Sequence, residues 1–136
     1  MATVLVHIRV RAGAEREFER LSRSLYLQTH RDEPNVRRYE YWRGAEPGLY
    51  YALISYDDFD GFLAHQTSAH HEAASPELGK VIETLELEWV DPIAEASPIT
   101  PSDMSPLRDD ASELAVRYHK RFAIEVKDWW LNMRRS

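Results

Sequence analysis

The sequence predicts an α+β fold in which strands and helices follow one another in the order β-α-β-β-α-β, with one more helix after them. Two observations support this prediction. Alternating apolar residues near both ends of the first ninety residues are typical of strands, and apolar residues spaced by three and four between them are typical of amphipathic helices. The chain has 136 residues, a usual length for one domain, and 43% of them are hydrophobic, which suffices for one core.

The first strand and the first helix are predicted from the spacing of their apolar residues. Residues 3–10 alternate, with Val4, Val6 and Ile8 on one face, which indicates a strand. Gly13 forms the turn that follows. The next apolar residues recur at intervals of three or four and predict an amphipathic helix with one apolar stripe, formed by Ala14, Phe18, Leu21, Leu25 and Thr29.

A β-hairpin and a second helical region are predicted next. Residues 36–43 and 49–56 are rich in strand-forming residues, and the five residues between them, which begin and end with glycine, suit a hairpin loop. Asp57 and Asp58 can cap a helix that we expect to bend or break near Thr67 and Ser68. A short helix starting at Pro76 and an alternating strand over residues 84–90 follow.

This order of elements is the split arrangement of a ferredoxin-like sheet. Two helices cover only one face of four strands, so the face that includes Leu5 requires another cover. A second copy of the chain is the simplest cover, and we therefore expect a homodimer. His7 and Arg9 lie on the same face, where Glu86 or Glu88 could pair with them.

The C-terminal third is predicted to form a connector and a helix. Four of the seven prolines lie between Pro92 and Pro106, and proline at this density favours neither a strand nor a helix. We therefore divide the chain into a domain over residues 1–92, a connector over 93–107 and a C-terminal amphipathic helix over 108–136. A broad apolar stripe on that helix is formed by Ala111, Leu114, Ala115, Tyr118, Phe122, Val126, Trp129 and Met133, and a narrow second one by Val116, Ile124 and Leu131.

Composition excludes several classes of function. The 17 basic and 23 acidic residues give a net charge of −6, which argues against non-specific binding to nucleic acid. The absence of cysteine excludes disulfides, thiolate metal ligands and a cysteine nucleophile. No apolar run approaches the ~18 residues of a membrane-spanning helix, and the start of the sequence does not resemble a secretion signal, so we expect a cytoplasmic protein without a membrane partner.

Three segments occur together in an order that resembles a known family. They are Ala12-Gly13 between the first strand and helix, residues 32–35 (Asp-Glu-Pro-Asn) ahead of Tyr39, and residues 64–70 (Ala-His-Gln-Thr-Ser-Ala-His). Together they resemble the antibiotic biosynthesis monooxygenase domain, a family of ferredoxin-like protomers that form dimeric α/β barrels. The resemblance covers about residues 3–92 of this chain.

The resemblance implies a pocket between the sheet and its helices in each protomer. In the family such a pocket accepts a planar aromatic compound, often a quinol or a polyketide-type phenol, and oxidises it with dioxygen without metal, flavin or other cofactor. A haem-degrading branch carries an asparagine on the first strand that has no counterpart near His7, so haem degradation is not expected. The alternative is a dimeric α/β barrel that binds a small molecule, or is structural, without catalysis.

Cofactor-free oxygenation requires a group that removes the phenolic proton, and a histidine with an ordinary pKa of ~6.5 suits that task near neutral pH. His70 and His65 are the candidates. On a continuous helix His70 shares the apolar face of Phe59 and points towards the sheet, whereas His65 points elsewhere. Alternatively, both histidines only form hydrogen bonds at the helix bend. The expected substrate pocket consists of Tyr39, Tyr56, Phe59, Phe62 and Trp89, although aromatic residues also favour strands for packing alone.

The histidine-rich segment also raises the question of a metal site. Two ligands on one face of a helix are normally three or four positions apart, whereas His65 is followed by His70 and His71 at spacings of five and six. These spacings point the side chains in different directions on a continuous helix. We therefore expect no metal and no other cofactor.

Overall fold

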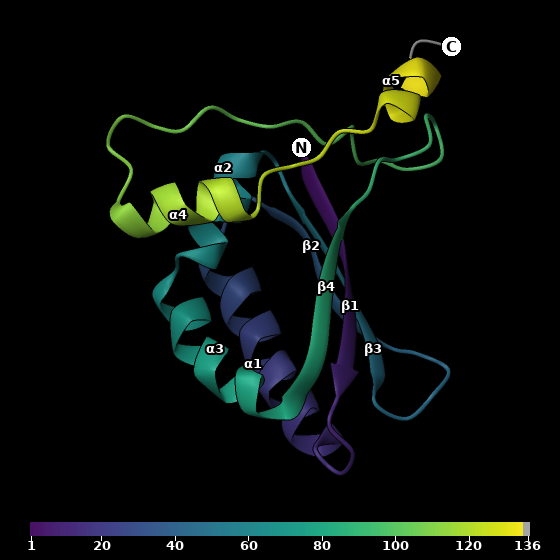
Figure 1. Ribbon diagram of the computed structural model, residues 1–136, viewed down its shortest axis with the longest axis vertical. Helices are drawn as coiled ribbons and strands as arrows, with labels where there is room; N and C mark the ends of the chain where they lie inside the picture. The colour runs from purple at the N-terminus through teal and green to yellow at the C-terminus, as the bar shows by residue number, and fades with distance from the viewer. Residues whose placement is uncertain (135–136) are drawn as a thin grey trace.

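The computed structural model describes residues 1–134 and has one four-stranded antiparallel sheet with helices packed on one face (Figure 1). The strand order is β2-β3-β1-β4. This is the ferredoxin-like arrangement, so the predicted α+β fold is confirmed. The elements are β1 (Ala2–Val10), α1 (Glu15–Asp32), β2 (Val36–Arg43), β3 (Leu49–Tyr56), α2 (Phe59–Gln66), α3 (Ala69–Val81), β4 (Ile82–Trp89), α4 (Glu113–Arg121) and α5 (Asp128–Arg134).

The core lies between the sheet and the helices that cover it. Val4, Val6 and Ile8 of β1 are at most 4% exposed, as their alternation predicts. Facing them, α1 buries the stripe predicted for it, with Phe18 and Leu25 each 1% exposed. None of the helices in residues 1–134 is both long and apolar enough to cross a bilayer.

The helical region after β3 is broken into two helices. The Asp58 side chain accepts a hydrogen bond from the backbone N–H of Gly61 at 2.8 Å and caps α2, as predicted. The helix ends at Gln66, and Thr67 and Ser68 separate it from α3. The hydroxyl of Ser68 accepts a hydrogen bond from the backbone N–H of His71, so a new helix begins there and not at Pro76 as predicted. The break near residues 67–68 is confirmed.

The prediction of a single helix over residues 108–133 is wrong. The structure has α4 and α5 with non-helical residues 122–127 between them, and Arg135 and Ser136 of the predicted segment lie outside the described residues. The change of direction buries Ile124 and Trp130, which are 8% and 9% exposed, whereas Trp129 and Met133 of the predicted stripe are 66% and 65% exposed. Burial of Ile124, in the non-helical segment, and of Trp130, on α5, has replaced burial of one continuous stripe.

Residues 93–107 have no helix or strand and cross the end of the sheet before the chain returns as α4 beside α2 (Figure 1). Ser102 attaches this segment to the sheet. Its fully buried hydroxyl accepts a hydrogen bond from the backbone N–H of Thr3 and donates one to the backbone oxygen of Val90, both at 3.0 Å. The C-terminal third therefore packs on the body of its own chain.

The outer face of the sheet carries a central apolar strip. Leu5 of β1 is directly opposite Leu53 of β3, and both are partly exposed. Next to them, His7 lies opposite Tyr51, and its Nε2 atom is 3.1 Å from Oε1 of Glu88. Arg9, by contrast, pairs with Glu46 of the hairpin loop. The predicted homodimer would bury this apolar strip, and the homodimer stays a prediction.

Candidate functional site

A cavity of about 520 Å³ lies between the sheet and the helices. Its walls are mainly apolar and come from the strands and from α1, α2, α3 and the end of α4. The apolar part of the lining includes Val6, Ile8, Phe18, Leu25, Ala52, Ile54, Phe62, Leu78, Leu87 and Phe122. The aromatic and titratable part includes Tyr39, Tyr41, His65 and His71.

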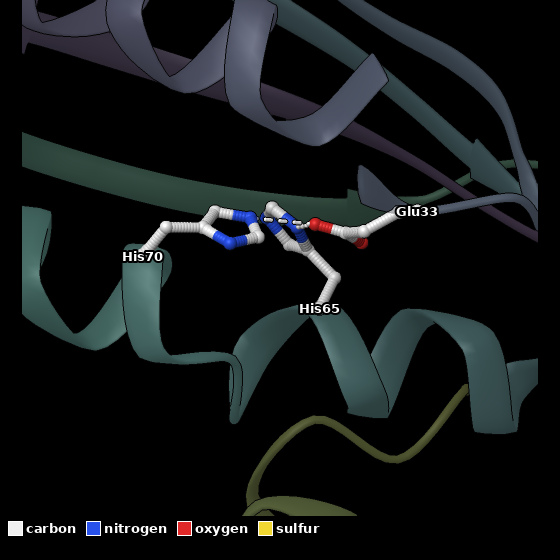
Figure 2. Close-up of side chains that lie close together, drawn as sticks. All are labelled: Glu33, His65 and His70. Carbon is white, nitrogen blue, oxygen red and sulfur yellow. Dashed lines mark hydrogen bonds and ion pairs between the residues drawn. The ribbon is translucent and has the colours of Figure 1, made fainter. Parts of the chain in front are cut away.

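Beside this cavity, one carboxylate joins three helices. Figure 2 shows the rings of His65 and His70 directed at the Glu33 carboxylate, whose Oε2 atom is 2.8 Å from Nδ1 of His65 and 2.7 Å from Nε2 of His70. The His65 side chain is 1% exposed, and those of Glu33 and His70 are 14% and 15% exposed. A carboxylate only accepts hydrogen bonds, so each histidine donates with the nitrogen that faces it.

The local sequence explains why these three side chains converge. Glu33 directly precedes Pro34, which disfavours helical geometry for the residue before it, and Glu33 accordingly has an extended backbone where α1 ends. His65 lies in the last turn of α2 and His70 in the first turn of α3. The break between those helices turns both rings towards the same carboxylate.

Tyr56 completes the set of donors to Glu33, with its hydroxyl 2.7 Å from Oε1. Burial is the largest influence on the pKa of Glu33 and raises it. The hydrogen bond and charge of His65, with hydrogen bonds from Tyr56 and His70, together outweigh burial and leave that pKa below its ordinary value. Burial, followed by the Glu33 hydrogen bond, raises the pKa of the Tyr56 hydroxyl far above its ordinary value. Glu33 is therefore an anion and Tyr56 a neutral donor.

His65 has a defined orientation on the cavity wall. Its ring centroid lies 4.9 Å from that of Tyr39 and 5.6 Å from that of Tyr56. Because Nδ1 donates to Glu33, the neutral imidazole carries its proton there and leaves Nε2 as the acceptor. This is the arrangement that a general base requires.

His71 is the second histidine on the wall, and it lies at a ring-centroid distance of 5.0 Å from His65. Its Nδ1 atom is buried without a hydrogen bond and lies 3.8 Å from Oε1 of Glu72. Burial, followed by repulsion from His65, lowers the pKa of His71 to about 4. The residue is therefore neutral at pH 7.

Glu33, His65 and His70 also offer a set of ligand atoms that all lie within 4.8 Å of one another. The sequence argument that a spacing of five points the two histidines apart is wrong, because it assumed a continuous helix. The distances nevertheless favour hydrogen bonds. Around tetrahedral zinc with bonds of about 2.0–2.1 Å, neighbouring ligand atoms are roughly 3.3 Å apart, whereas the two nitrogens here lie 2.8 and 2.7 Å from Oε2 of Glu33.

The structure divides the residues that the sequence suggested for the site. Tyr39, Phe62 and His65 line the cavity. His70 and Tyr56 contact Glu33 and do not line the cavity. Phe59 is fully buried beneath α4. Trp89 packs on Phe62 with ring centroids 5.0 Å apart. Sequence reasoning missed the roles of Glu33, Tyr41 and His71. For Glu33, its position directly before Pro34 was an available signal.

A more open hollow of about 680 Å³ lies between α1 and the β2–β3 hairpin, with Trp42 and Tyr26 on its walls. None of the histidines lines it. Among its charged residues Glu19 is paired with Arg43, and hydrogen bonds from Arg43 and Tyr50 lower the pKa of Glu19 to about 2. The cavity beside His65 is therefore the stronger candidate for a reaction site.

Comparisons with known proteins agree on the fold. Residues 1–77 match the family model described as antibiotic biosynthesis monooxygenase. A candidate antibiotic biosynthesis monooxygenase from Caulobacter crescentus has a TM-score of 0.65 and 23% identity, with 68% of this chain and 89% of that one covered. A second, from Bacteroides thetaiotaomicron, has a TM-score of 0.66 and 17% identity, with 73% and 95% covered.

A Mycobacterium tuberculosis protein gives a TM-score of 0.63 at 21% identity and covers 71% of this chain and 98% of its own. No match was found among curated proteins. At these identities the structural similarities show a shared fold. The C-terminal third, including α4 and α5, lies outside the segment that matches the family model.

Proposed function

This chain belongs to the antibiotic biosynthesis monooxygenase family, and on that premise we propose that it is a cofactor-independent monooxygenase acting on a small phenolic or quinol-type aromatic compound. The observation that supports the proposal most directly is the pair formed by His65 and Glu33. His65 lines a mainly apolar cavity, and its Nδ1 atom is held by the Glu33 carboxylate at 2.8 Å.

In the proposed reaction, Nε2 of His65 removes the phenolic proton of the substrate. The resulting imidazolium is stabilised by the anionic Glu33, in the way that a buried carboxylate orients and stabilises the histidine of a catalytic triad. Tyr56 and His70 hold the carboxylate in place through their own hydrogen bonds. They act as positioning residues and not as proton acceptors.

The electron-rich phenolate then supplies all the electrons that dioxygen needs. For a phenol the balance is phenol plus dioxygen gives quinone plus water, so one oxygen atom becomes a carbonyl of the product and the other leaves as water. The carbon that gains oxygen loses three electrons and the carbon that bears the phenolic oxygen loses one, which together reduce dioxygen, so no external reductant is required. The apolar walls would exclude water and favour transfer of these electrons to dioxygen over side reactions.

The test measures oxygen consumption with a panel of hydroquinones and anthrones, using His65→Gln and His70→Gln as a matched pair. Both histidines contact the same carboxylate oxygen, but only His65 lines the cavity. We expect His65→Gln to lower turnover by roughly 10²–10⁴-fold and His70→Gln to have a much smaller effect. Turnover lost in His70→Gln and retained in His65→Gln would contradict this assignment of roles.

The same panel separates the proposal from its alternative. If aromatic compounds bind in the cavity and wild-type protein consumes no oxygen with any of them, the chain is a small-molecule-binding member of the family without catalysis. Activity that disappears on dialysis against a chelator and returns with a divalent metal would instead show that Glu33, His65 and His70 act as metal ligands.

A further inference from the structure

The cavity is closed in part by a residue that carries a permanent charge. Within the described part of the chain, the cavity lining contains no Asp, Glu or Lys, and Arg121 is its one arginine. It is the last residue of α4, and its neighbour Phe122 also lines the cavity. Both residues lie outside residues 1–77, which match the family model. The C-terminal segment therefore adds a permanent cation to a wall that otherwise has no Asp, Glu, Lys or Arg among its described residues.

The guanidinium of Arg121 has no carboxylate partner within residues 1–134. Its Cζ atom lies 5.1 Å from the centre of the Phe122 ring, which orients the planar group without neutralising its charge. Glu72 is the acid that contacts this helix, and it accepts a hydrogen bond from Tyr118 at 3.0 Å. The donors of Arg121 remain available to a ligand.

We propose that Arg121 binds a carboxylate on the aromatic substrate and so selects hydroxylated aromatic acids over neutral phenols. This inference rests on the proposed function, in which the phenolic ring of the substrate binds in the cavity. It adds a carboxylate as a second group by which the protein recognises the substrate. A guanidinium presents paired donors that match the two oxygens of a carboxylate. The volume of about 520 Å³ is within the usual range for a small-molecule pocket.

The position of Arg121 also suits a substrate that enters ring first. The residue is exposed while it contributes to the cavity lining, so it lies at the rim. The ring of a bound compound would lie among the apolar and aromatic walls, on which His65 is placed, and its carboxylate would remain at the rim. A single compound could then contact the base through a phenol and Arg121 through an acid group.

Two quinols that differ by one carboxylate test the proposal: 1,4-dihydroxy-2-naphthoate and 1,4-dihydroxynaphthalene. Binding of each is measured by calorimetry without oxygen, so that turnover does not contribute. We expect the wild-type chain to bind the carboxylated compound at least about tenfold more tightly. Arg121→Gln should abolish that preference and leave the affinity for the neutral compound unchanged, and Arg121→Lys should retain part of it.

Arg117→Gln is the matched control, because Arg117 is an exposed arginine on the same helix that does not line the cavity. It removes the same charge and should keep the full preference. Equal affinity of the wild type for both compounds, no binding of the carboxylated compound at millimolar concentration, or a preference that survives Arg121→Gln would each overturn the proposal. Binding that depends on Arg121 without oxygen consumption would contradict only the proposed function, and turnover without the preference would contradict only this inference.

Discussion

The Nδ1 atom of His65 lies 2.8 Å from Oε2 of Glu33, although 32 positions separate the two residues in the chain. The contact joins the end of α1 to the end of α2, and His70 brings the start of α3 to the same oxygen. The site is therefore built into the junction of three helices. Changes to Glu33 should affect both the proposed chemistry and the free energy of unfolding.

Glu33→Gln tests the role of the carboxylate. Glutamine keeps the shape of the side chain but not its charge, so the protonated ring of His65 loses its stabilising anion and the neutral ring is no longer fixed in one tautomer. We expect turnover in the oxygen assay to fall by ~10²-fold or more with little change in KM. Glu17→Gln is the control, because Glu17 lies on α1, the helix that ends just before Glu33, and pairs with Arg20 at the surface. Unchanged turnover in Glu33→Gln would show that the carboxylate is only structural.

His71 should make the protein less stable at mildly acidic pH. Because burial lowers the pKa of this residue to about 4, only the unfolded state binds a proton as the pH falls below ~6.5. The contribution of neutral His71 to the free energy of unfolding is therefore complete above pH ~6.5. It decreases between pH ~6.5 and about pH 4 and does not decrease further below about pH 4. The loss is at most about 3 kcal/mol. Urea titrations at pH 7.5 and 4.5 should show a smaller difference for His71→Gln than for wild type.

Ser102→Ala should destabilise the attachment of the C-terminal segment. The substitution leaves a buried backbone N–H at Thr3 and a backbone oxygen at Val90 without this partner, which costs ~1–3 kcal/mol. Ser97→Ala is the control, since the hydroxyl of Ser97 accepts one hydrogen bond at an exposed position. Thermal unfolding followed by circular dichroism compares them. Equal melting temperatures of the two variants would show that Ser102 is not a point of attachment.

The outer face of the sheet should form a dimer interface. Sedimentation equilibrium at micromolar concentration should give twice the 15.9 kDa of one chain. Leu53→Lys places a charge in the centre of the apolar strip opposite Leu5, so it should yield monomer with the secondary structure retained. A wild-type chain that remains monomeric would mean that this strip stays exposed, and the barrel arrangement would be wrong.

The fold could be predicted from the sequence because its signals are local. The alternation in β1, the apolar stripe of α1 and the cap at Asp58 each lie within a few neighbouring residues, and each was found as predicted. The break at Thr67 and Ser68 was also predicted, but its effect on side-chain direction was not. Helical periodicity is defined only along an unbroken helix, so it could not show that His65 and His70 face one carboxylate.

The C-terminal region shows where periodicity fails. Residues 108–133 have a helical pattern, yet the chain turns after Phe122. The turn allows Ile124 and Trp130 each to be buried against the rest of the protein. Such a turn depends on surfaces formed by residues far away in sequence. The same limit applies to Arg121, since its contribution to the cavity exists only when α4 lies beside α2.

The route of the chain across the end of the sheet sets the order in which the molecule can be completed during synthesis (Figure 1). Domains begin to fold from the N-terminal side as the ribosome releases them. Thr3 can meet Ser102 only after a further 99 residues have been made, and α4 follows later still. A nascent chain with its sheet already formed would therefore have an open cavity without Arg121. The proposed ligand selection by this residue would therefore begin only after α4 has left the ribosome.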